Sequence, residues 1–219
     1  MRLVIFDVDG TLVDSQADII ASMRAAFGDQ NLTPPVRADI LGIVGLSLDV
    51  AMHKLAPEAD NARLVRAYKD SYADLRRANG AASSPLYPGA RAVLDALAAR
   101  DDVLLGVATG KSKRGLDGLI EAHGLQGLFA TQQVADFHPS KPHPSMIHAA
   151  LSETGTDATH AVMIGDTSYD LDMAAAAGVR GIGVAWGYHL RGQLGAAHTV
   201  IDRFEDLHGV LDTLWSDIP

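Results

Sequence analysis

A regular alternation of short apolar runs and helical patterns restricts the fold of this 219-residue chain more than any other feature. The apolar runs have the length of buried strands and lie at residues 3–6, 103–108, 128–134, 161–164, 181–185 and, more weakly, 198–201. Helical patterns follow at residues 90–99, 112–123, 144–152 and 168–177. Strands that alternate with helices predict an α/β fold built on a parallel sheet.

The stretch from residue 15 to residue 84 breaks this alternation. Its helical patterns at 16–27, 46–55 and 58–79 have no convincing strand between them. Asp14 and Ser15 offer a helix N-cap at one edge, and a small, polar run closes the other. We therefore expect a helical domain at residues 15–84, inserted through two hinges into a core formed by residues 1–14 and 85–219.

Composition narrows the partners that this chain can have. A net charge of −9 and the lack of a long basic run disfavour nucleic acid, and no apolar stretch is long enough for a bilayer. The chain has no cysteine, and its first apolar run leaves no room for a cleavable export signal. We expect a cytoplasmic protein with a small soluble partner, while the sequence leaves the oligomeric state open.

Two aspartates follow the first apolar run, at the strand end where parallel sheets bind their ligands. Asp7 and Asp9 are two residues apart, so extended chain directs both carboxylates the same way. Crowded carboxylates favour a cation, and Mg²⁺ suits one or two of them together with water and a phosphate group. Asp9 and Gly10 also fit an ordinary turn.

Polar residues after two later runs are candidates for binding phosphate. Thr109 and Gly110 combine a hydroxyl, an approachable backbone and a helix N-terminus, although Thr109 also fits a simple N-cap. Lys111 beside them is expected in solvent. Lys141 lies in a proline-rich loop that would fix its ammonium group, although most lysines are surface residues.

A second acidic pair follows the run at residues 161–164. Asp166 and Asp170 are four residues apart at the start of a helical pattern, where Asp166 could complete a metal site. The same arrangement also fits an N-cap with an acidic first turn.

Taken in order, these motifs resemble those of the haloacid dehalogenase superfamily in its phosphatase branch. The resemblance rests on residues 7–12 (DVDGTL), Thr109-Gly110, Lys141-Pro142 and residues 165–170 (GDTSYD). The helical insertion is similar to the small cap domain of that family, and the layout is similar to phosphoglycolate phosphatase-like members. The resemblance thus implies a Rossmann-like parallel-sheet core with an inserted helical cap.

The resemblance also implies roles for individual residues. Asp7 would be the nucleophile, and Asp9 the general acid and base. Metal ligands would be Asp7, the main-chain carbonyl of Asp9 and Asp166, with support from Asp170 and Mg²⁺ as the cofactor. The phosphate group would be bound by the backbone at Val8 and Gly110 and by the side chains of Thr109 and Lys141.

The implied function is a Mg²⁺-dependent phosphomonoester hydrolase that works through an aspartyl-phosphate intermediate on a small phosphorylated metabolite. The leading substrate is 2-phosphoglycolate, and similar sequences also act on sugar phosphates, pyrophosphate and nucleoside monophosphates. Alternatives are an enzyme like the β-phosphoglucomutases or the phosphonatases, or a noncatalytic phosphate-ligand binding protein. Asp9 argues against carbon–halogen cleavage, because the similar dehalogenases lack this second aspartate.

Substrate specificity is expected from the glycine-containing cap segment at residues 41–47. This segment has no basic residue, which disfavours a mutase, since similar mutases bind a second phosphate with an arginine there. Arg37 or Lys54 are left as cap residues for a substrate carboxylate, or as ordinary surface charges.

Overall fold

The computed structural model describes residues 1–216, which form a six-stranded parallel sheet in the order β3-β2-β1-β4-β5-β6. The strand bounds are β1 Arg2–Phe6, β2 Val103–Thr109, β3 Thr131–Val134, β4 Ala161–Gly165, β5 Arg180–Val184 and β6 Thr199–Ile201. The first strand lies at the centre, where Val4 pairs with Leu105 of β2 and Val162 of β4. The predicted α/β class is confirmed, and the residues that follow β1 are placed in the middle of the sheet edge.

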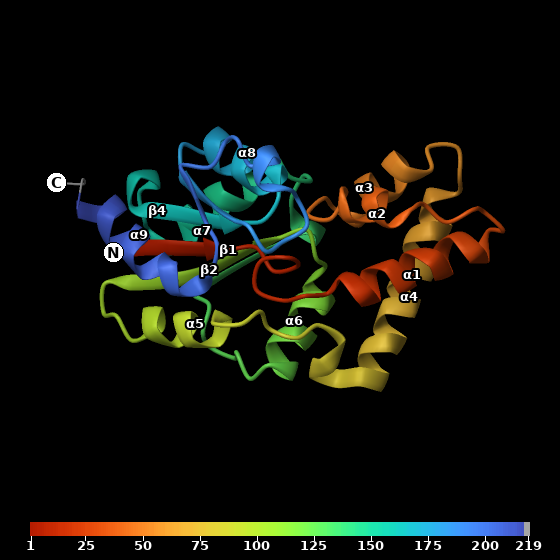
Figure 1. The fold of residues 1–219 in the computed structure, drawn as a ribbon, viewed down its shortest axis with the longest axis horizontal. Coiled ribbons are helices and arrows are strands. Elements are labelled where there is room, and N and C mark those ends of the chain that lie inside the picture. The colour runs from red at the N-terminus through yellow and green to blue at the C-terminus, as the bar shows by residue number, and fades with distance from the viewer. Residues whose placement is uncertain (217–219) are drawn as a thin grey trace.

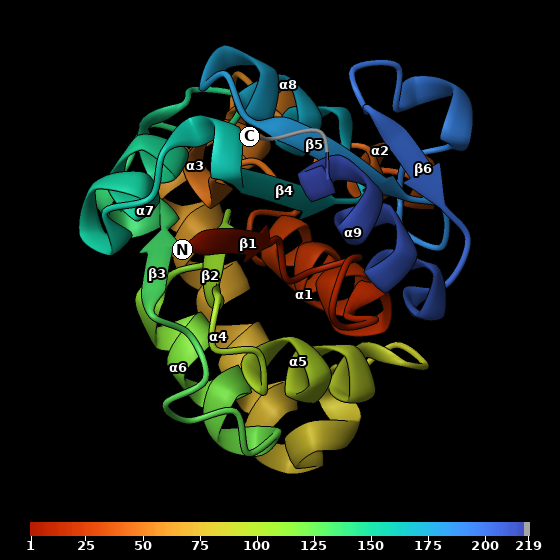
Figure 2. The ribbon, with the colours of Figure 1, turned by 90° about the vertical axis from the view of Figure 1, so that its left-hand side faces the viewer.

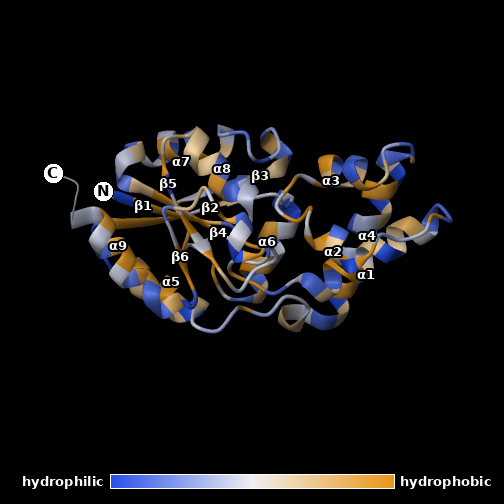
Figure 3. Ribbon diagram, turned by 45° about the horizontal axis from the view of Figure 1, so that its top comes forward, coloured by the Kyte–Doolittle hydropathy of each residue, from blue (hydrophilic) through white to orange (hydrophobic). Residues whose placement is uncertain are grey.

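Helices cover both faces of this sheet (Figures 1 and 2). Their bounds are α5 Ala90–Ala98, α6 Lys113–Ala122, α7 Ser145–Thr154, α8 Ser168–Ala176 and α9 Leu207–Ser216. Side chains alternate along β1, so Val4 and Phe6 pack with α5, α6 and α9, while Leu3 and Ile5 pack with α7 and α8. Apolar residues therefore concentrate along the strands, as the orange segments of Figure 3 show.

Four further helices lie together at the end of the sheet towards which the strands point (Figure 1). They are α1 Gln16–Asp29, α2 Arg37–Leu41, α3 Leu48–Leu55 and α4 Asn61–Asn79. They share an apolar core of their own, which includes Met23, Met52 and Leu64. The chain enters and leaves this layer side by side, because the amide of Asp14 donates to the carbonyl of Pro85 at 2.9 Å.

Most predicted elements occur within a few residues of their expected bounds, and the differences have local causes. Helix α4 begins at Asn61 rather than at residue 58, because the carboxylate of Asp60 accepts from the amide of Arg63 and caps it there. Helices α2 and α9 were not predicted. Among the described residues, no helix is both long and apolar enough to span a membrane.

Candidate active site

Three buried carboxylates meet at the carboxyl ends of the two central strands. Asp7 follows β1 and Asp166 follows its neighbour β4, while Asp170 lies in the first turn of α8. Each is at most 1% exposed, and each offers an oxygen within 4.8 Å of the others. The structure therefore brings together three of the residues that the sequence singled out.

The side chain of Lys141 is buried beside this cluster. Its ammonium nitrogen lies 2.9 Å from Oδ1 of Asp7 and 2.6 Å from Oδ1 of Asp170. With all three carboxylates ionised, one ammonium against them leaves a formal charge of −2 in a buried volume. Because buried charge is stable only when it is compensated, the cluster has the charge and the oxygen donors that a divalent cation requires.

Burial dominates the electrostatics of the cluster. It raises the pKa of Asp7, which Lys141 lowers and Asp170 raises again, to about 7. It also raises the pKa of Asp166 well above its usual range, with repulsion from Asp170 and Asp7 adding to the effect. Burial lowers the pKa of Lys141, but attraction to Asp170 and Asp7 outweighs it and holds the lysine charged.

The carboxylate of Asp166 is fixed by residues that the sequence did not identify. Thr11 donates its hydroxyl to Oδ1 at 2.9 Å, and the amide of Tyr188 donates to Oδ2 at 2.8 Å. Two glycines make room for it, because a Cβ on Gly10 would lie 2.2 Å from Oδ2 and one on Gly187 would lie 2.1 Å from Cβ of Asp166. Gly10 and Thr11 adjoin the first motif, but nothing local in the sequence points to Gly187.

Asp170 has two structural partners as well as its place in the cluster. Thr167, rather than Asp166, is the N-cap of α8, and it forms a capping box with Asp170. Oδ2 of Asp170 accepts from the amide of Thr167 at 3.1 Å and from its hydroxyl at 2.7 Å, which leaves Oδ1 for Lys141. The interpretation of Asp166 as a helix cap is therefore wrong.

The side chain of Asp9 makes its contacts with a second lysine. Both its carboxylate oxygens lie 2.7 Å from Nζ of Lys111, and the hydroxyl of Ser15 donates to Oδ1 at 2.5 Å. Lys111 was expected in solvent, but its side chain is only 9% exposed. The expectation is wrong because the Asp9 carboxylate and the hydroxyl of Tyr72, 3.2 Å from Nζ, compensate the buried ammonium.

The first edge of the helical insertion also differs in detail from expectation. Ser15 is the N-cap residue of α1, but its hydroxyl makes no cap hydrogen bond. It serves Asp9 instead and also lies 3.1 Å from the hydroxyl of Tyr188. The position of the helix start was thus predicted, while the partner of the side chain was not.

The remaining candidates for phosphate binding lie beside Asp7. Thr109 is the buried last residue of β2, and its hydroxyl accepts from the amide of Lys111 at 3.2 Å. The N-cap of α6 is Ser112, so Thr109 is not a helix cap. A Cβ on Gly110 would lie 2.6 Å from the carbonyl oxygen of Gly45, and only glycine allows this approach. Val8 is buried between the two aspartates.

The loop between α2 and α3 lies against the core beside the site. The hydroxyl of Tyr169 donates to the carbonyl of Gly42 at 3.0 Å, and the amide of Ser47 donates to the hydroxyl of Ser140, next to Lys141, at 2.8 Å. Residues 43–47 line a cleft of about 820 Å³ that also contains Asp7, Asp9 and residues 109–111. The segment predicted to provide specificity therefore faces the site.

The two residues of the helical insertion that were considered for a substrate carboxylate lie elsewhere. Arg37 is exposed and donates to the side chain of Gln16. Nζ of Lys54 donates to the hydroxyl of Tyr169 at 3.1 Å and lies 5.6 Å from the centre of its ring. Neither is among the described residues that line the cleft.

A parallel α/β sheet with a lysine buried among carboxylates at its strand ends is the arrangement expected of the family that the sequence resembles. The chain belongs to the haloacid dehalogenase-like hydrolase family, whose family model matches residues 4–184. Within that family it is a phosphatase, as the curated relatives indicate. The family expected from the sequence is thereby confirmed.

Relatives match over nearly the whole chain. A probable phosphatase, IndB, of Dickeya dadantii is 37% identical over 218 residues, which cover 97% of this chain and 94% of that protein. A phosphoglycolate phosphatase of Agrobacterium fabrum is 33% identical, over 85% of this chain and 81% of that protein. The crystal structure of a hydrolase from Pseudomonas syringae is 25% identical and superposes with a TM-score of 0.84, over 97% of this chain and 99% of that one.

Proposed function

We propose that this protein is a Mg²⁺-dependent phosphomonoester hydrolase that works through an aspartyl-phosphate intermediate on Asp7. The observation that carries the proposal is the buried cluster of Asp7, Asp166 and Asp170 around Lys141. Such a cluster is not needed for packing, because apolar residues of similar volume are often as stable or more stable in a buried site.

The residues of the cluster fit a magnesium ion. Hard oxygen donors and a formal charge of −2 match its preference for carboxylates, with other positions left to water and substrate phosphate. Asp7, Asp166 and the main-chain carbonyl of Asp9 would hold it, with Asp170 in support. When bound, the cation offsets the repulsion between the Asp7 carboxylate and the phosphate group.

Asp7 attacks phosphorus in the first half of the reaction. An Asp7 oxygen forms a bond to phosphorus while the bond from phosphorus to the ester oxygen breaks. Lys141, 2.9 Å from Asp7, orients this carboxylate and attracts the phosphoryl oxygens. Thr109 and the backbone amides at Val8 and Gly110 donate further hydrogen bonds to those oxygens.

Asp9 transfers the proton in both halves of the reaction. In its protonated form it donates to the ester oxygen, which leaves as an alcohol. The resulting carboxylate then takes a proton from water, which attacks phosphorus, releases inorganic phosphate and restores Asp7. Lys111 and Ser15 hold the carboxylate form of Asp9 in place by the contacts already described.

Residues 15–84 would act as a cap on a core formed by residues 1–14 and 85–219. Closure of the cap would exclude water while the leaving group departs, and opening would release the product. The hydrogen bonds from Tyr169 to Gly42 and from Ser47 to Ser140 support the proposal, since they join the helical layer to the core beside the site.

The substrate would be a small phosphorylated metabolite of the cytoplasm. Among candidates, 2-phosphoglycolate is the first to test, because the Agrobacterium fabrum relative is named a phosphoglycolate phosphatase. A phosphonatase-like or mutase-like enzyme is the alternative. Arg37 and Lys54, the two basic residues considered in the cap, lie outside the cleft lining, whereas Lys69, Arg76 and Arg77 of α4 line it. A noncatalytic binding protein would have no use for Asp9 and its two partners.

The test is release of inorganic phosphate from 2-phosphoglycolate, sugar phosphates, nucleoside monophosphates and pyrophosphate. Wild type and Asp7→Asn are compared with Mg²⁺ and with EDTA. We expect turnover by wild type in Mg²⁺, and background rates in EDTA and for Asp7→Asn. Turnover that survives in Asp7→Asn would refute the proposed nucleophile, and silence of the wild type on the whole panel would favour the alternatives.

A further inference from the structure

The cleft beside Asp7 is large for the smallest candidate substrate. Its volume is about 820 Å³, and it extends from Asp7 and Asp9 along α4 to Arg77 and Gly80. Cavities of roughly 300–1,000 Å³ bind ligands of drug size. A two-carbon leaving group such as glycolate would therefore leave most of the cleft unfilled.

The cap side of this cleft is apolar. Ile19 and Met23 of α1 line it together with Val44 and Leu46 of the loop before α3, and all four side chains are at most 9% exposed. Tyr68 and Tyr72 complete the wall from α4, where a spacing of four residues places them on one face of the helix. Their rings stack with centroids 5.9 Å apart and planes 18° apart.

The cations of the cleft lie beside the apolar wall or at its exposed rim. Lys111 pairs with Asp9. Arg76 donates from Nη1 to the carbonyl of Gly115 at 2.7 Å, while its Nη2 is buried near Gly118 without a hydrogen-bond partner. The rim carries both signs of charge, with the exposed residues Asp49, Lys69, Arg77, Arg114, Glu121 and Asp136. None of the six side chains that form the apolar wall is cationic, so an anionic leaving group buried against them would lose hydration without gaining a charged partner on that wall.

We propose that this wall is a leaving-group subsite for an apolar, ring-sized body. Given the proposed function, on which this inference rests, the substrate class is a phosphate monoester whose alcohol carries such a body, rather than a short acid. Stacked tyrosines and buried aliphatic side chains gain free energy from each apolar group that they remove from water. Tyr68 and Tyr72 of α4 then determine specificity together with the loop at residues 43–47.

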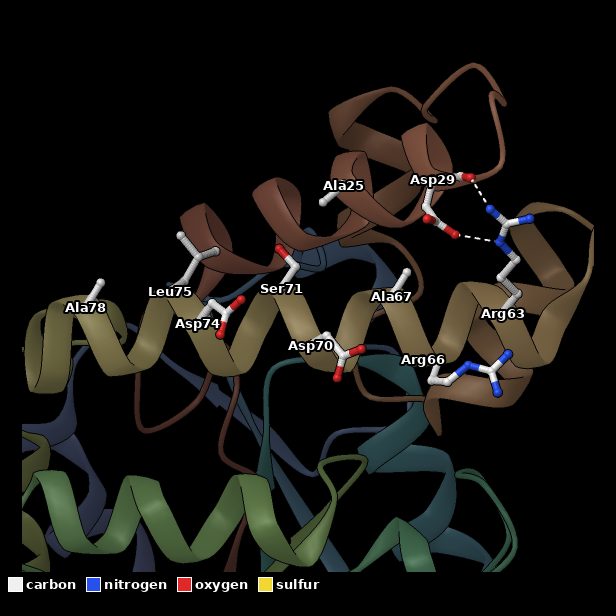
Figure 4. Close-up of a pocket in the computed structure, with 10 residues that line it drawn as sticks. All are labelled: Ala25, Asp29, Arg63, Arg66, Ala67, Asp70, Ser71, Asp74, Leu75 and Ala78. Carbon is white, nitrogen blue, oxygen red and sulfur yellow. Dashed lines mark hydrogen bonds and ion pairs between the residues drawn. The ribbon is translucent and has the colours of Figure 1, made fainter.

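A second hollow in the cap differs from this wall, because it is not apolar. It lies between α1 and α4 and is lined by charged and small residues, among them Asp29, Arg63 and Ala78 (Figure 4). Figure 4 shows the guanidinium of Arg63 already engaged by Asp29, which accepts at its carboxylate and its carbonyl, each at 2.6 Å. This hollow does not include Asp7, so it offers a matched control on the same helix.

Binding of phosphonates tests the subsite without any turnover. Methylphosphonate, benzylphosphonate and naphthylmethylphosphonate carry the same head group and cannot be hydrolysed at an ester oxygen, so calorimetry with wild type in Mg²⁺ compares their bodies alone. We expect Kd to fall at least about tenfold from the methyl to the naphthylmethyl compound. Equal Kd values across the series would overturn the inference.

Two variants of α4 test whether the apolar body of the phosphonate binds in the cleft. Ala73 lines the cleft, so Ala73→Phe should fill it and raise Kd for naphthylmethylphosphonate about tenfold. Ala78→Phe places the same ring in the outer hollow and should leave Kd unchanged. Circular dichroism checks folding, and Ala73→Leu replaces Ala73→Phe if the larger ring prevents it. Equal effects of the two variants would contradict the proposed location.

Kinetics separate this inference from the proposed function. Ethyl phosphate and benzyl phosphate are both esters of primary alcohols, so the ratio of their kcat/KM values measures the effect of the apolar body of the leaving group. We expect benzyl phosphate to be favoured at least about tenfold. Mg²⁺-dependent turnover that favours ethyl phosphate or 2-phosphoglycolate would refute the subsite and keep the phosphatase. Tight binding of naphthylmethylphosphonate with no ester hydrolysed would refute the phosphatase and keep the subsite.

Discussion

The ammonium nitrogen of Lys141 lies 2.9 Å from Oδ1 of Asp7, and neither side chain is more than 1% exposed. A charge pair at this depth loses its hydration and is stable only while both partners remain. The same ammonium also pairs with Asp170, so Lys141 compensates two carboxylates. Its contribution therefore concerns the stability of the fold as well as the chemistry of the site.

Lys141→Met should lower the free energy of unfolding by about 3–5 kcal/mol in the absence of metal, because it leaves buried carboxylates uncompensated. Urea unfolding measures this change. The control is Lys113→Met, whose partner Asp117 is exposed and whose pair should contribute at most about 1 kcal/mol. Similar losses in the two variants would show that Lys141 is not a compensating charge.

The raised pKa of Asp7 makes the stability of the metal-free protein depend on pH. The folded value is about 7, and an unfolded aspartate has about 3.9, so the folded state binds more protons between these values. The contribution of this proton to the free energy of unfolding is complete below the unfolded pKa and is lost as pH rises through about 7. We expect the melting temperature in EDTA to fall across this window more steeply for wild type than for Asp7→Asn.

Magnesium should reverse that trend, because it binds the carboxylate form. The gain in melting temperature from Mg²⁺ over EDTA should grow from about pH 5 to about pH 8. A gain that is independent of pH, or equally large in Asp7→Asn, would argue against a metal held by this cluster.

Gly187→Ala should damage the site from outside the four motifs. The Cβ of the new alanine would lie 2.1 Å from Cβ of Asp166, so the Asp166 carboxylate must shift away from Thr11 and Tyr188. We expect a loss of stability of about 1–3 kcal/mol and a weaker effect of Mg²⁺ on the melting temperature. In Gly192→Ala a Cβ would meet nothing within 4 Å, and this variant should behave as wild type.

Lys111→Met should affect the step in which the leaving oxygen takes its proton. Lys111 contacts both oxygens of Asp9, so its loss frees the side chain that we propose as general acid. Turnover of an alkyl phosphate should fall about tenfold or more, whereas p-nitrophenyl phosphate, whose leaving group needs little protonation, should be affected less. Equal losses on the two substrates would show that Lys111 does not act through Asp9.

The sequence predicted the elements that are repeated and periodic. Short apolar runs alternating with helical patterns predicted the parallel sheet. Asp7 and Asp166 follow two of these runs closely, and Lys141 lies further along the loop after a third. These residues converge because parallel strands end at one edge, a property of the fold class rather than of any single residue. The helical insertion was visible because α1 and α4 are long.

Contacts between distant segments were not predictable from pattern. The sequence predicts Lys111 as a surface lysine, because its partners Asp9 and Tyr72 are 102 and 39 residues away in the chain. Gly187 is one of many glycines, and its closeness to Asp166 follows only from the packing of the loop after β5. Helix α2 has five residues, too few for a periodic pattern.

A covalent phosphoryl group on Asp7 tests the central claim most directly. Wild type in Mg²⁺ is mixed with its best substrate, quenched in acid within a turnover and digested for mass spectrometry. We predict a phosphoryl group on the peptide that contains Asp7, lost on treatment with hydroxylamine as an acyl phosphate and missing from Asp7→Asn. Phosphate release at full rate with no such adduct, or with the adduct on another residue, would contradict the account.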